Sequence, residues 1–415
     1  MRFLQKLSWL GPGILTASAA IGTSHFVQSI RAGGYFGYEL LWVVLAVNIL
    51  KYPFIEYGFR YTAATKENLL AGYKKLSPMT FYLFLALNVI LSIAGVAVLT
   101  FICSGVLKSI FNLPFSIKYI AIFVFLISWF IIAFGHYKYL DKLMKIFMVL
   151  LLITTIAAVA LAMINYTPSD NQFYNESAWN PKHIPFIIAL MGWMPGPLEL
   201  SVWHSLWLEA QNREENKLDF EKAKFDFNVS YILMIVTAVL FMSIGALIIH
   251  NSPTPISTDT AIYTSQLISS YTSVIGDWAK IIISASLFAA IFSTTLTLVD
   301  VYPRTLATGW TIIKRNTQTH YRHKIHSRLI LLSCFGAFFI IYSVTNFTIL
   351  IDTVTTTAFL TGPLFAFLNY KLVYSDLVDD QYKPSKYMKL LSILGFVYFL
   401  GFIVLFAWSK MYANI

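Results

Sequence analysis

The chain has 415 residues, of which 57% are hydrophobic and 12% charged, and its formal net charge is +10. Soluble domains carry about 25% charged residues, so the composition excludes an ordinary soluble enzyme. It predicts an integral membrane protein with a single transmembrane domain over residues 1–415. The basic residues lie in short intervals between apolar runs, where they set membrane topology. We therefore expect the lipid bilayer, and no nucleic acid, as a partner of this chain.

Apolar runs are numerous enough to cross a membrane about eleven times, at about 20 residues for each span. The predicted helices cover residues 8–33, 38–62, 80–107, 117–135, 141–165, 184–210, 226–250, 275–303, 327–345, 347–373 and 387–408. Lysine and arginine gather in alternate loops, which places the N-terminus in the cytoplasm and, after an odd number of spans, the C-terminus outside. We expect the plasma (inner) membrane of a bacterium. The sequence contains no nucleophile constellation and no phosphate-binding loop, so we expect no enzymatic activity and no cofactor beyond a coupling ion.

The first predicted helix is interrupted at its centre by Gly22-Thr23-Ser24-His25. Glycine loosens the backbone, and hydroxyl side chains compete for its hydrogen bonds. The imidazole of His25 would lie where water is scarce. A helix broken in mid-membrane is tolerated where the freed backbone lines a cavity, and in transporters that cavity is typically the substrate site.

Residues 191–199, Met-Gly-Trp-Met-Pro-Gly-Pro-Leu-Glu, interrupt the helix predicted at 184–210, because two prolines remove backbone donors and two glycines loosen the chain. Two such interruptions, one in each half of a chain, indicate the binding site of an inverted-repeat transporter. The alternative interpretation is two ordinary kinks and a histidine of packing value. The residues predicted to bind substrate are Gly22, Thr23, Ser24, His25, Met191, Met194 and Gly196.

Short motifs in the first, second and sixth predicted helices resemble the natural resistance-associated macrophage protein (Nramp) family. They are Gly11-Pro12-Gly13, Ala32-Gly33, Phe36-Gly37-Tyr38, Leu41-Trp42, Thr62-Ala63-Ala64-Thr65 and Met194-Pro195. The resemblance implies an all-α membrane protein of LeuT-type fold, with helices 1 and 6 unwound at the substrate site. Two inverted repeats of five helices would cover about 8–165 and 184–373, and one extra helix 387–408. Members of the family typically import manganese, iron and related divalent metals together with protons.

The sequence departs from the family where its members bind metal and move protons. The family's helix 1 carries Asp-Pro-Gly-Asn, whose Asp and Asn bind the metal, and Gly22 and His25 stand at those positions here. The family's helix 6 carries Met-Pro-His, and Gly196 replaces the histidine tied to proton handling. Residues 81–106 contain no Asp or Glu, although the family passes protons along helix 3. The comparison with the family therefore implies a site without its metal ligands and its proton relay.

Two substrate hypotheses follow for this secondary active transporter. A site without a carboxylate that faces the N-termini of two half-helices favours a small inorganic anion such as bicarbonate, because each N-terminus offers free N–H groups and about half a positive charge. The alternative is a divalent metal importer, proton-coupled as in the family, with His25 and Met194 as its ligands. In that case Glu199 is the only carboxylate close in sequence.

Coupling and gating residues are predicted on three further helices. Ala290, Ser293 and Thr294 resemble the sodium site of LeuT-type transporters, so sodium is a candidate coupling ion, with ordinary packing hydroxyls as the alternative. Ionisable groups inside a membrane rarely lie idle, which makes Glu199 a candidate for pairing with a base or for gating. The other candidates for gating or coupling are Asp352 and Thr355. A monomer is compatible with the sequence, which leaves the oligomeric state open.

Overall fold

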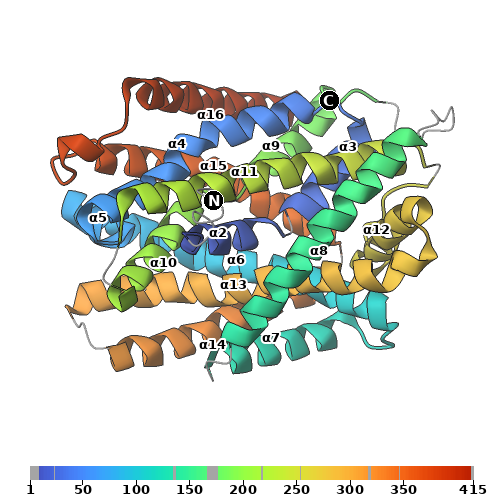
Figure 1. Cartoon of the computed structure of the whole chain (residues 1–415), viewed down its shortest axis with the longest axis horizontal. Coiled ribbons are helices and arrows are strands. Elements are labelled where there is room, and N and C mark those ends of the chain that lie inside the picture. Colours follow the sequence, from blue (N-terminus) through green and yellow to red (C-terminus); the bar gives the residue numbers. More distant parts are fainter. Residues whose placement is uncertain are drawn as a thin grey trace, which may run out of the picture.

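The computed structural model describes residues 9–22, 24–133, 137–165, 176–215, 218–252, 254–315, 319–344 and 346–412, which are helical or lie in short connections. The first half contains α2 (Pro12–Ala20), the π-helix η1 (Ser24–Ser29), α3 (Ile30–Phe36), α4 (Leu41–Thr65), α5 (Leu69–Leu76), α6 (Pro78–Phe111), α7 (Ile117–Ala133) and α8 (Tyr137–Ile164). The second half contains η2 (Pro181–His183), α9 (Ile184–Gly192), α10 (Leu200–Glu215), α11 (Phe220–Ile244), η3 (Gly245–Ile249), α12 (Thr260–Ile275), η4 (Asp277–Ala279), α13 (Lys280–Lys314), α14 (Thr319–Ser343), α15 (Phe347–Val373), η5 (Asp380–Tyr382) and α16 (Lys386–Tyr412). Most of the long helices run side by side, and α8 crosses the bundle obliquely (Figure 1).

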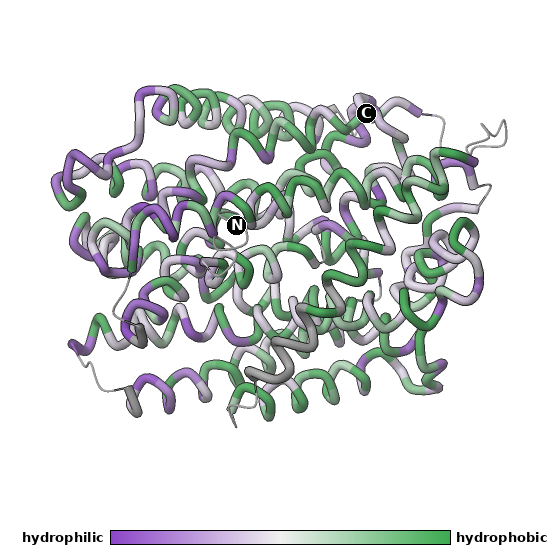
Figure 2. Tube along the Cα trace, in the orientation of Figure 1, coloured by the Kyte–Doolittle hydropathy of each residue, from purple (hydrophilic) through white to green (hydrophobic). Residues whose placement is uncertain are grey.

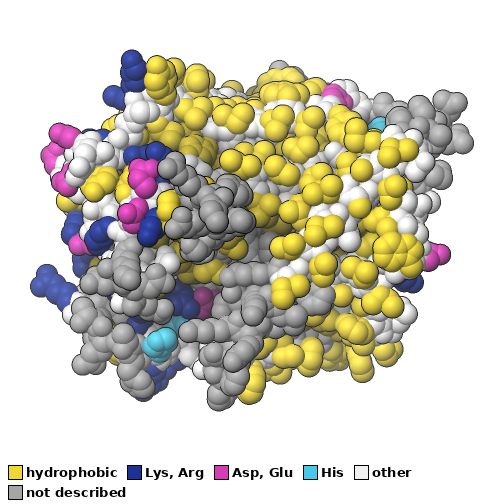
Figure 3. Space-filling model, in the orientation of Figure 1, with side chains coloured by type: hydrophobic (Ala, Val, Ile, Leu, Met, Phe, Trp, Pro, Cys, Tyr) yellow, Lys and Arg dark blue, Asp and Glu magenta, His cyan; other side chains and the backbone are white. Residues whose placement is uncertain are grey.

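Six helical segments in the described ranges are long and apolar enough to cross a membrane, and they match the third and the seventh to eleventh predicted helices. Hydrophobic residues dominate the middle of the bundle, while hydrophilic residues concentrate toward its two ends (Figure 2). On the face shown in Figure 3, hydrophobic side chains cover most of the surface and charged side chains gather mainly at the left end. This is the surface of a protein embedded in lipid.

Both predicted helix breaks are present. In the first, α2 ends at Ala20, and a π-helix begins at Ser24 and leads directly into α3 at Ile30. In the second, α9 ends at Gly192 and α10 begins at Leu200, so seven residues with two prolines lie between them. Proline and glycine withdraw donors and helical preference locally, which is why sequence alone located both breaks.

Two helices were not expected, and one is longer than expected. Both α5 and α12 occupy segments that we predicted as loops, because they are too short or too polar for a membrane span. The helix α13 continues to Lys314, beyond the predicted end at residue 303. A hydropathy rule stops at the first charged residues, whereas a helix C-terminus tolerates basic side chains well.

Long-range contacts join the loops at one end of the bundle, which we call the basic end because it carries Lys66, Lys74 and Lys75. The ammonium of Lys66 donates to the carbonyl of Leu218, which precedes α11. The ammonium of Lys74 donates to the carbonyl of Ile312 near the end of α13. The basic segments that follow the second, sixth and eighth predicted helices therefore meet at one end of the bundle, as their shared positive charge indicated.

The first half-helix, α2, is tied to α11 by a single carboxylate. Both oxygens of Asp226 accept backbone hydrogen bonds at the N-terminus of α2, from Gly11 N at 3.0 Å and from Gly13 N at 2.6 Å. The carboxylate satisfies donors that a helix N-terminus leaves unpaired, and its charge opposes the positive end of the helix.

Asp226→Ala is expected to destabilise the protein by about 1–2 kcal/mol, the usual loss for an N-cap carboxylate. Hydrogen–deuterium exchange should rise across α2, because the contact that holds its N-terminus would be gone. Asp219→Ala is the matched control, since Asp219 caps only its own helix α11 through Lys222 N at 2.9 Å. Equal exchange in α2 of both variants would contradict this role for Asp226.

Candidate functional site

A small buried cavity lies between the two broken helices. Its volume is about 20 Å³, roughly what a single water molecule needs. The first break contributes Ala20 and Ser24, the second contributes Gly196 and Pro197, and the neighbouring helices add Trp203 and Thr294. None of the described residues that line the cavity is acidic. The cavity therefore lies between the two predicted breaks. Its walls are mainly apolar, with Leu99 and Leu298 among them, and the hydroxyl-bearing side chains in the lining are Ser24 and Thr294.

Gly22 lies against the side chain of Thr294 on α13. A Cβ built at residue 22 would overlap the Thr294 hydroxyl, methyl and Cβ, and Thr294 is itself buried and β-branched. This position therefore accepts a glycine and excludes any larger side chain, a carboxylate included, unless α13 moves. Thr23, the next predicted ligand, lies outside the described residues.

The side chain of Lys51 contacts the second break directly. Lys51 comes from the middle of α4 and is 1% exposed. Its Nζ donates to the carbonyls of Met191 at 2.7 Å, Gly192 at 2.8 Å and Gly196 at 3.2 Å. One side chain thus joins the C-terminal end of α9 to the unwound segment that leads to α10. The signal in the sequence was a lysine near the centre of a predicted membrane helix, which we did not connect to the break.

Glu199 lies at the end of the same break and is fully buried. Neither oxygen of its carboxylate has a hydrogen-bond partner in the part of the chain that the structure describes. It interacts electrostatically with the ammonium of Lys51, without forming an ion pair with it. The predicted pairing of Glu199 with a base is therefore at most a long-range one in this conformation.

His25 is buried in the first break, and its ring is turned toward α11. Its Nε2 lies 3.0 Å from the carbonyl oxygen of Met234. Because a carbonyl only accepts, Nε2 carries a proton and donates it. Its Nδ1 lies 2.8 Å from the hydroxyl of Ser24 and 3.0 Å from the carbonyl oxygen of Ala20. Both nitrogens are occupied, so neither offers a lone pair to a metal ion here, and a direct role for His25 in substrate binding stays a prediction.

The two predicted methionines lie in the second break and at the end of α9. The thioether of Met191 accepts a hydrogen bond from the hydroxyl of Tyr398 on α16 at 2.8 Å. Met194 is fully buried and lies outside the residues that line the cavity. Within the described ranges, moreover, no three His, Cys, Asp or Glu side chains gather closely enough to hold a metal ion.

The residues predicted to bind sodium do meet helix 1. The hydroxyl of Thr294 lies 3.1 Å from the carbonyl oxygen of Ser18 and 3.0 Å from that of Ala290. The hydroxyl of Ser293 lies 3.3 Å from the hydroxyl of Ser18. The structure thus gathers carbonyl and hydroxyl oxygens from α2 and α13 at one place. Ser18 is the member that the sequence did not indicate.

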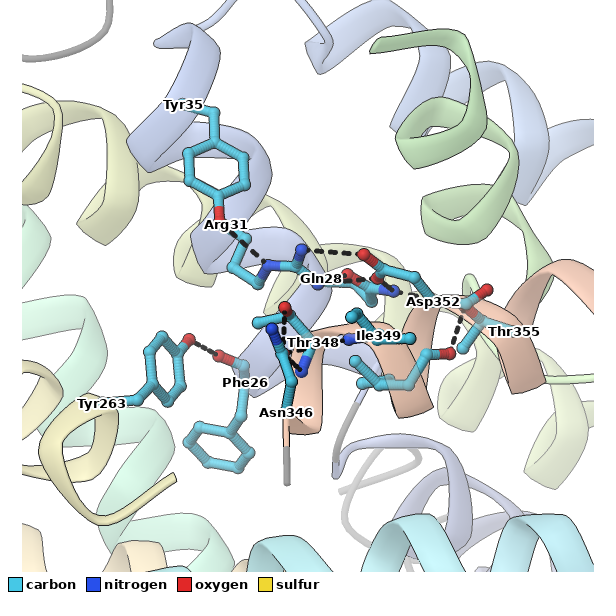
Figure 4. Close-up of polar contacts among 11 residues, drawn as sticks. Phe26, Gln28, Arg31, Tyr35, Tyr263, Asn346, Thr348, Ile349, Asp352 and Thr355 are labelled. Carbon is cyan, nitrogen blue, oxygen red and sulfur yellow. Dashed lines mark hydrogen bonds and ion pairs between the residues drawn. The ribbon is translucent and has the colours of Figure 1, made fainter. Parts of the chain in front are cut away.

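A polar network joins the first broken helix to α15 (Figure 4). Arg31 of α3 forms a bidentate ion pair with Asp352 of α15, with N–O distances of 2.7 and 2.9 Å. Gln28 of η1 donates to Asp352 at 3.0 Å and to the hydroxyl of Thr355 at 3.2 Å. Asp352 and Thr355 therefore act together, as a contact between the first broken helix and α15. Arg31 and Gln28 were the partners that sequence could not supply.

One further buried histidine was missed. His204 of α10 is fully buried, with Nδ1 2.6 Å from the hydroxyl of Thr16 on α2. Its Nε2 has no hydrogen-bond partner among the described residues. The contact links the two broken helices on the basic side of the cavity. The sequence signal was an ionisable residue inside the helix predicted at 184–210.

Comparison with known proteins identifies the family. The model for natural resistance-associated macrophage protein-like (Nramp) sequences matches residues 13–409. The chain belongs to the Nramp family. An uncharacterised protein of Pasteurella multocida is 32% identical over 408 residues, which cover 97% of this chain and 92% of that protein. A divalent metal cation transporter, MntH of Chromohalobacter salexigens, is 38% identical over 68 residues, or 16% of each chain.

Solved structures confirm the predicted LeuT-type fold of this Nramp-family transporter. The manganese transporter of Eremococcus coleocola matches with a TM-score of 0.71 at 13% identity, over 99% of this chain and 95% of that one. The transporter MhsT in complex with L-phenylalanine matches with a TM-score of 0.62 at 15% identity, over 95% and 98% of the two chains. These neighbours are transporters, which agrees with the prediction that the chain is not an enzyme.

Proposed function

We propose that this Nramp-family protein transports a small inorganic anion, such as bicarbonate, through the cavity between its two broken helices. The observation that carries the proposal is the unused hydrogen-bond donor of Trp203. Trp203 lines the cavity, and its indole N–H is buried without a partner among the described residues. An indole N–H only donates, so it can bind an anion or a neutral oxygen and cannot ligate a cation.

Charge supports the same choice. The cavity has no acidic lining residue in the described chain, and the ammonium of Lys51 is bound to the carbonyl of Gly196 in the cavity wall. A divalent cation at this place would need negative charge to offset its desolvation, whereas an anion would be attracted by the ammonium. At about 20 Å³ the cavity has room for about one water molecule, so bicarbonate would enter it only after the broken helices move apart.

Import of a divalent metal is the second candidate function. Its support is the similarity to MntH transporters and to the manganese transporter of known structure. It would require a ligand set other than the one near the cavity in this conformation, with Glu199 as the nearest carboxylate. The two candidates differ in the sign of the transported charge, which makes them separable by direct measurement.

Transport by purified protein in liposomes tests both. Manganese entry would be followed with a trapped fluorophore, and bicarbonate entry by the change in internal pH, each with and without a sodium gradient. We expect bicarbonate-dependent alkalinisation without manganese entry. Saturable manganese entry through the wild-type protein would overturn the anion proposal and favour the family's metal substrate.

Trp203→Phe should weaken anion transport about 10- to 100-fold in kcat/KM, the loss expected for one hydrogen bond to a charged group. Phenylalanine keeps an aromatic ring in the cavity wall and removes the donor. Trp193→Phe is the matched control, because Trp193 also lines the cavity but its indole is not among the buried groups without a partner. Equal losses in both variants would indicate a change in cavity shape.

Sodium coupling is proposed at the oxygen cluster of Ser18, Ala290, Ser293 and Thr294. Ser293→Ala should then abolish the sodium dependence of transport while leaving the protein folded, since within the described residues the Ser293 hydroxyl makes one long contact, at 3.3 Å, to Ser18.

A bacterial plasma membrane, with the N-terminus inside and the C-terminus outside, is proposed from the charge of the loops.

A further inference from the structure

Lys51 of α4 reaches the break between α9 and α10, although α4 is distant from it in the sequence. Its three acceptors are Met191, Gly192 and Gly196, which lie 140 to 145 residues away along the chain. Two of these carbonyls belong to the last residues of α9, where a helix leaves its carbonyls without intrahelical partners and carries the negative end of its dipole. The third acceptor, Gly196, lies between Pro195 and Pro197 in the unwound segment.

The number of acceptors matches the ammonium form of lysine. Three carbonyl oxygens surround Nζ at 2.7, 2.8 and 3.2 Å. Carbonyls only accept, and an ammonium has three N–H donors, one for each of them. Lys51 is 1% exposed, so water cannot replace these contacts. The Glu199 carboxylate, buried nearby and without a hydrogen bond in the described chain, supplies compensating charge.

We propose that the carbonyls of Met191, Gly192 and Gly196 form a binding site for a small monovalent cation, and that the protein fills it with its own ammonium. Transporters commonly bind their coupling cations with unwound carbonyls and half-helix C-termini. Here a tethered cation takes that place, holds α9 to the segment leading to α10, and excludes a free ion. This proposal is about the cation that the three carbonyls bind, and it does not depend on which substrate binds in the cavity.

Removal of the tether should make the site available to added cations. Lys51→Ala retains Cβ and removes three methylenes and the ammonium, which together match n-propylammonium. The variant is expected to melt below wild type because buried carbonyls lose their partner. Added n-propylammonium should raise its melting temperature saturably, by about 2 °C or more. Methylammonium and sodium should act more weakly, because neither fills the space left by the side chain.

Two controls separate site binding from general salt effects. Tetramethylammonium has the same charge but no N–H donor, so it should leave Lys51→Ala unchanged. Lys51→Met fills the space without charge, so it should melt below wild type and respond to none of these cations. A Lys51→Ala protein that is recovered only with n-propylammonium in the solubilisation buffer would also meet the prediction.

Several results would overturn the inference. Equal effects of n-propylammonium and tetramethylammonium would show that no donor-specific site exists. Amine effects of the same size in wild type would place the binding elsewhere. A Lys51→Met protein as stable as wild type would show that the carbonyls need no cation. Because melting is measured without substrate, these outcomes stand apart from success or failure of the anion transport assay.

Discussion

Gly192→Ala is expected to abolish transport and to lower stability by about 3 kcal/mol, the upper part of the range for overpacking a buried site. A Cβ at residue 192 would overlap the backbone carbonyl of Thr355 on α15. Backbone cannot swing aside as a flexible side chain can, so α9 or α15 must shift. A shift of α9 would displace the Gly192 carbonyl, which accepts a hydrogen bond from Lys51 at 2.8 Å, and a shift of α15 would displace Thr355 and the Asp352 that pairs with Arg31. Thermal melting and liposome transport measure the two effects.

Gly401→Ala is the matched control for this substitution. It makes the same chemical change in another membrane helix, α16, where an added Cβ meets no atom within 4 Å. We expect it to be neutral or slightly stabilising, because alanine favours helix over glycine by up to about 1 kcal/mol. If Gly192→Ala behaved like Gly401→Ala, the close packing of α9 on α15 would not be needed for folding or transport.

Asp352→Ala is expected to lower the free energy of unfolding of the protein by up to about 3 kcal/mol. The substitution leaves Arg31, whose side chain is 4% exposed, buried without its carboxylate partner. The estimate lies at the low end for buried pairs because Asp352 is 29% exposed, which lets water compensate in part. We therefore expect a lower melting temperature. A cysteine reporter at residue 29 should also be labelled faster, because Ser29 is buried beside the network and its hydroxyl forms no hydrogen bond within the described chain.

Glu67→Ala provides the contrasting case. It removes an ion pair with Lys75 whose side chains are 50% and 38% exposed, and such pairs contribute about 0–1 kcal/mol. The variant should melt close to wild type and leave the reporter unchanged. Equal decreases in melting temperature in the two variants would mean that burial does not set the strength of the Arg31–Asp352 contact. The network would then have no particular role in holding α3 against α15.

Predictions from local sequence were confirmed where the physics is local. Both helix breaks form at glycine, proline and hydroxyl residues, whose effects extend over one or two turns. The Nramp family and the LeuT-type fold also follow from short motifs near these breaks.

The site itself was predicted less completely. Sequence placed Ser24 and Gly196 at the cavity and Thr294 beside helix 1, and these placements agree with the structure. It also grouped His25 with Met194, whereas the ring of His25 hydrogen-bonds to the backbone of α11. A polar residue in a membrane helix signals a partner without indicating the direction of its side chain.

The sequence by itself determined the membrane class of the chain, the places where two helices break, and the small polar residues around the gap. Each of these depends on composition or on the conformational preferences of neighbouring residues. Only the tertiary structure decided which charges meet: Lys51 with carbonyls 140 residues away, and Arg31 with Asp352 across 321 residues. The physical reason is that a buried charge must find compensation wherever packing supplies it, and packing is set by the whole bundle.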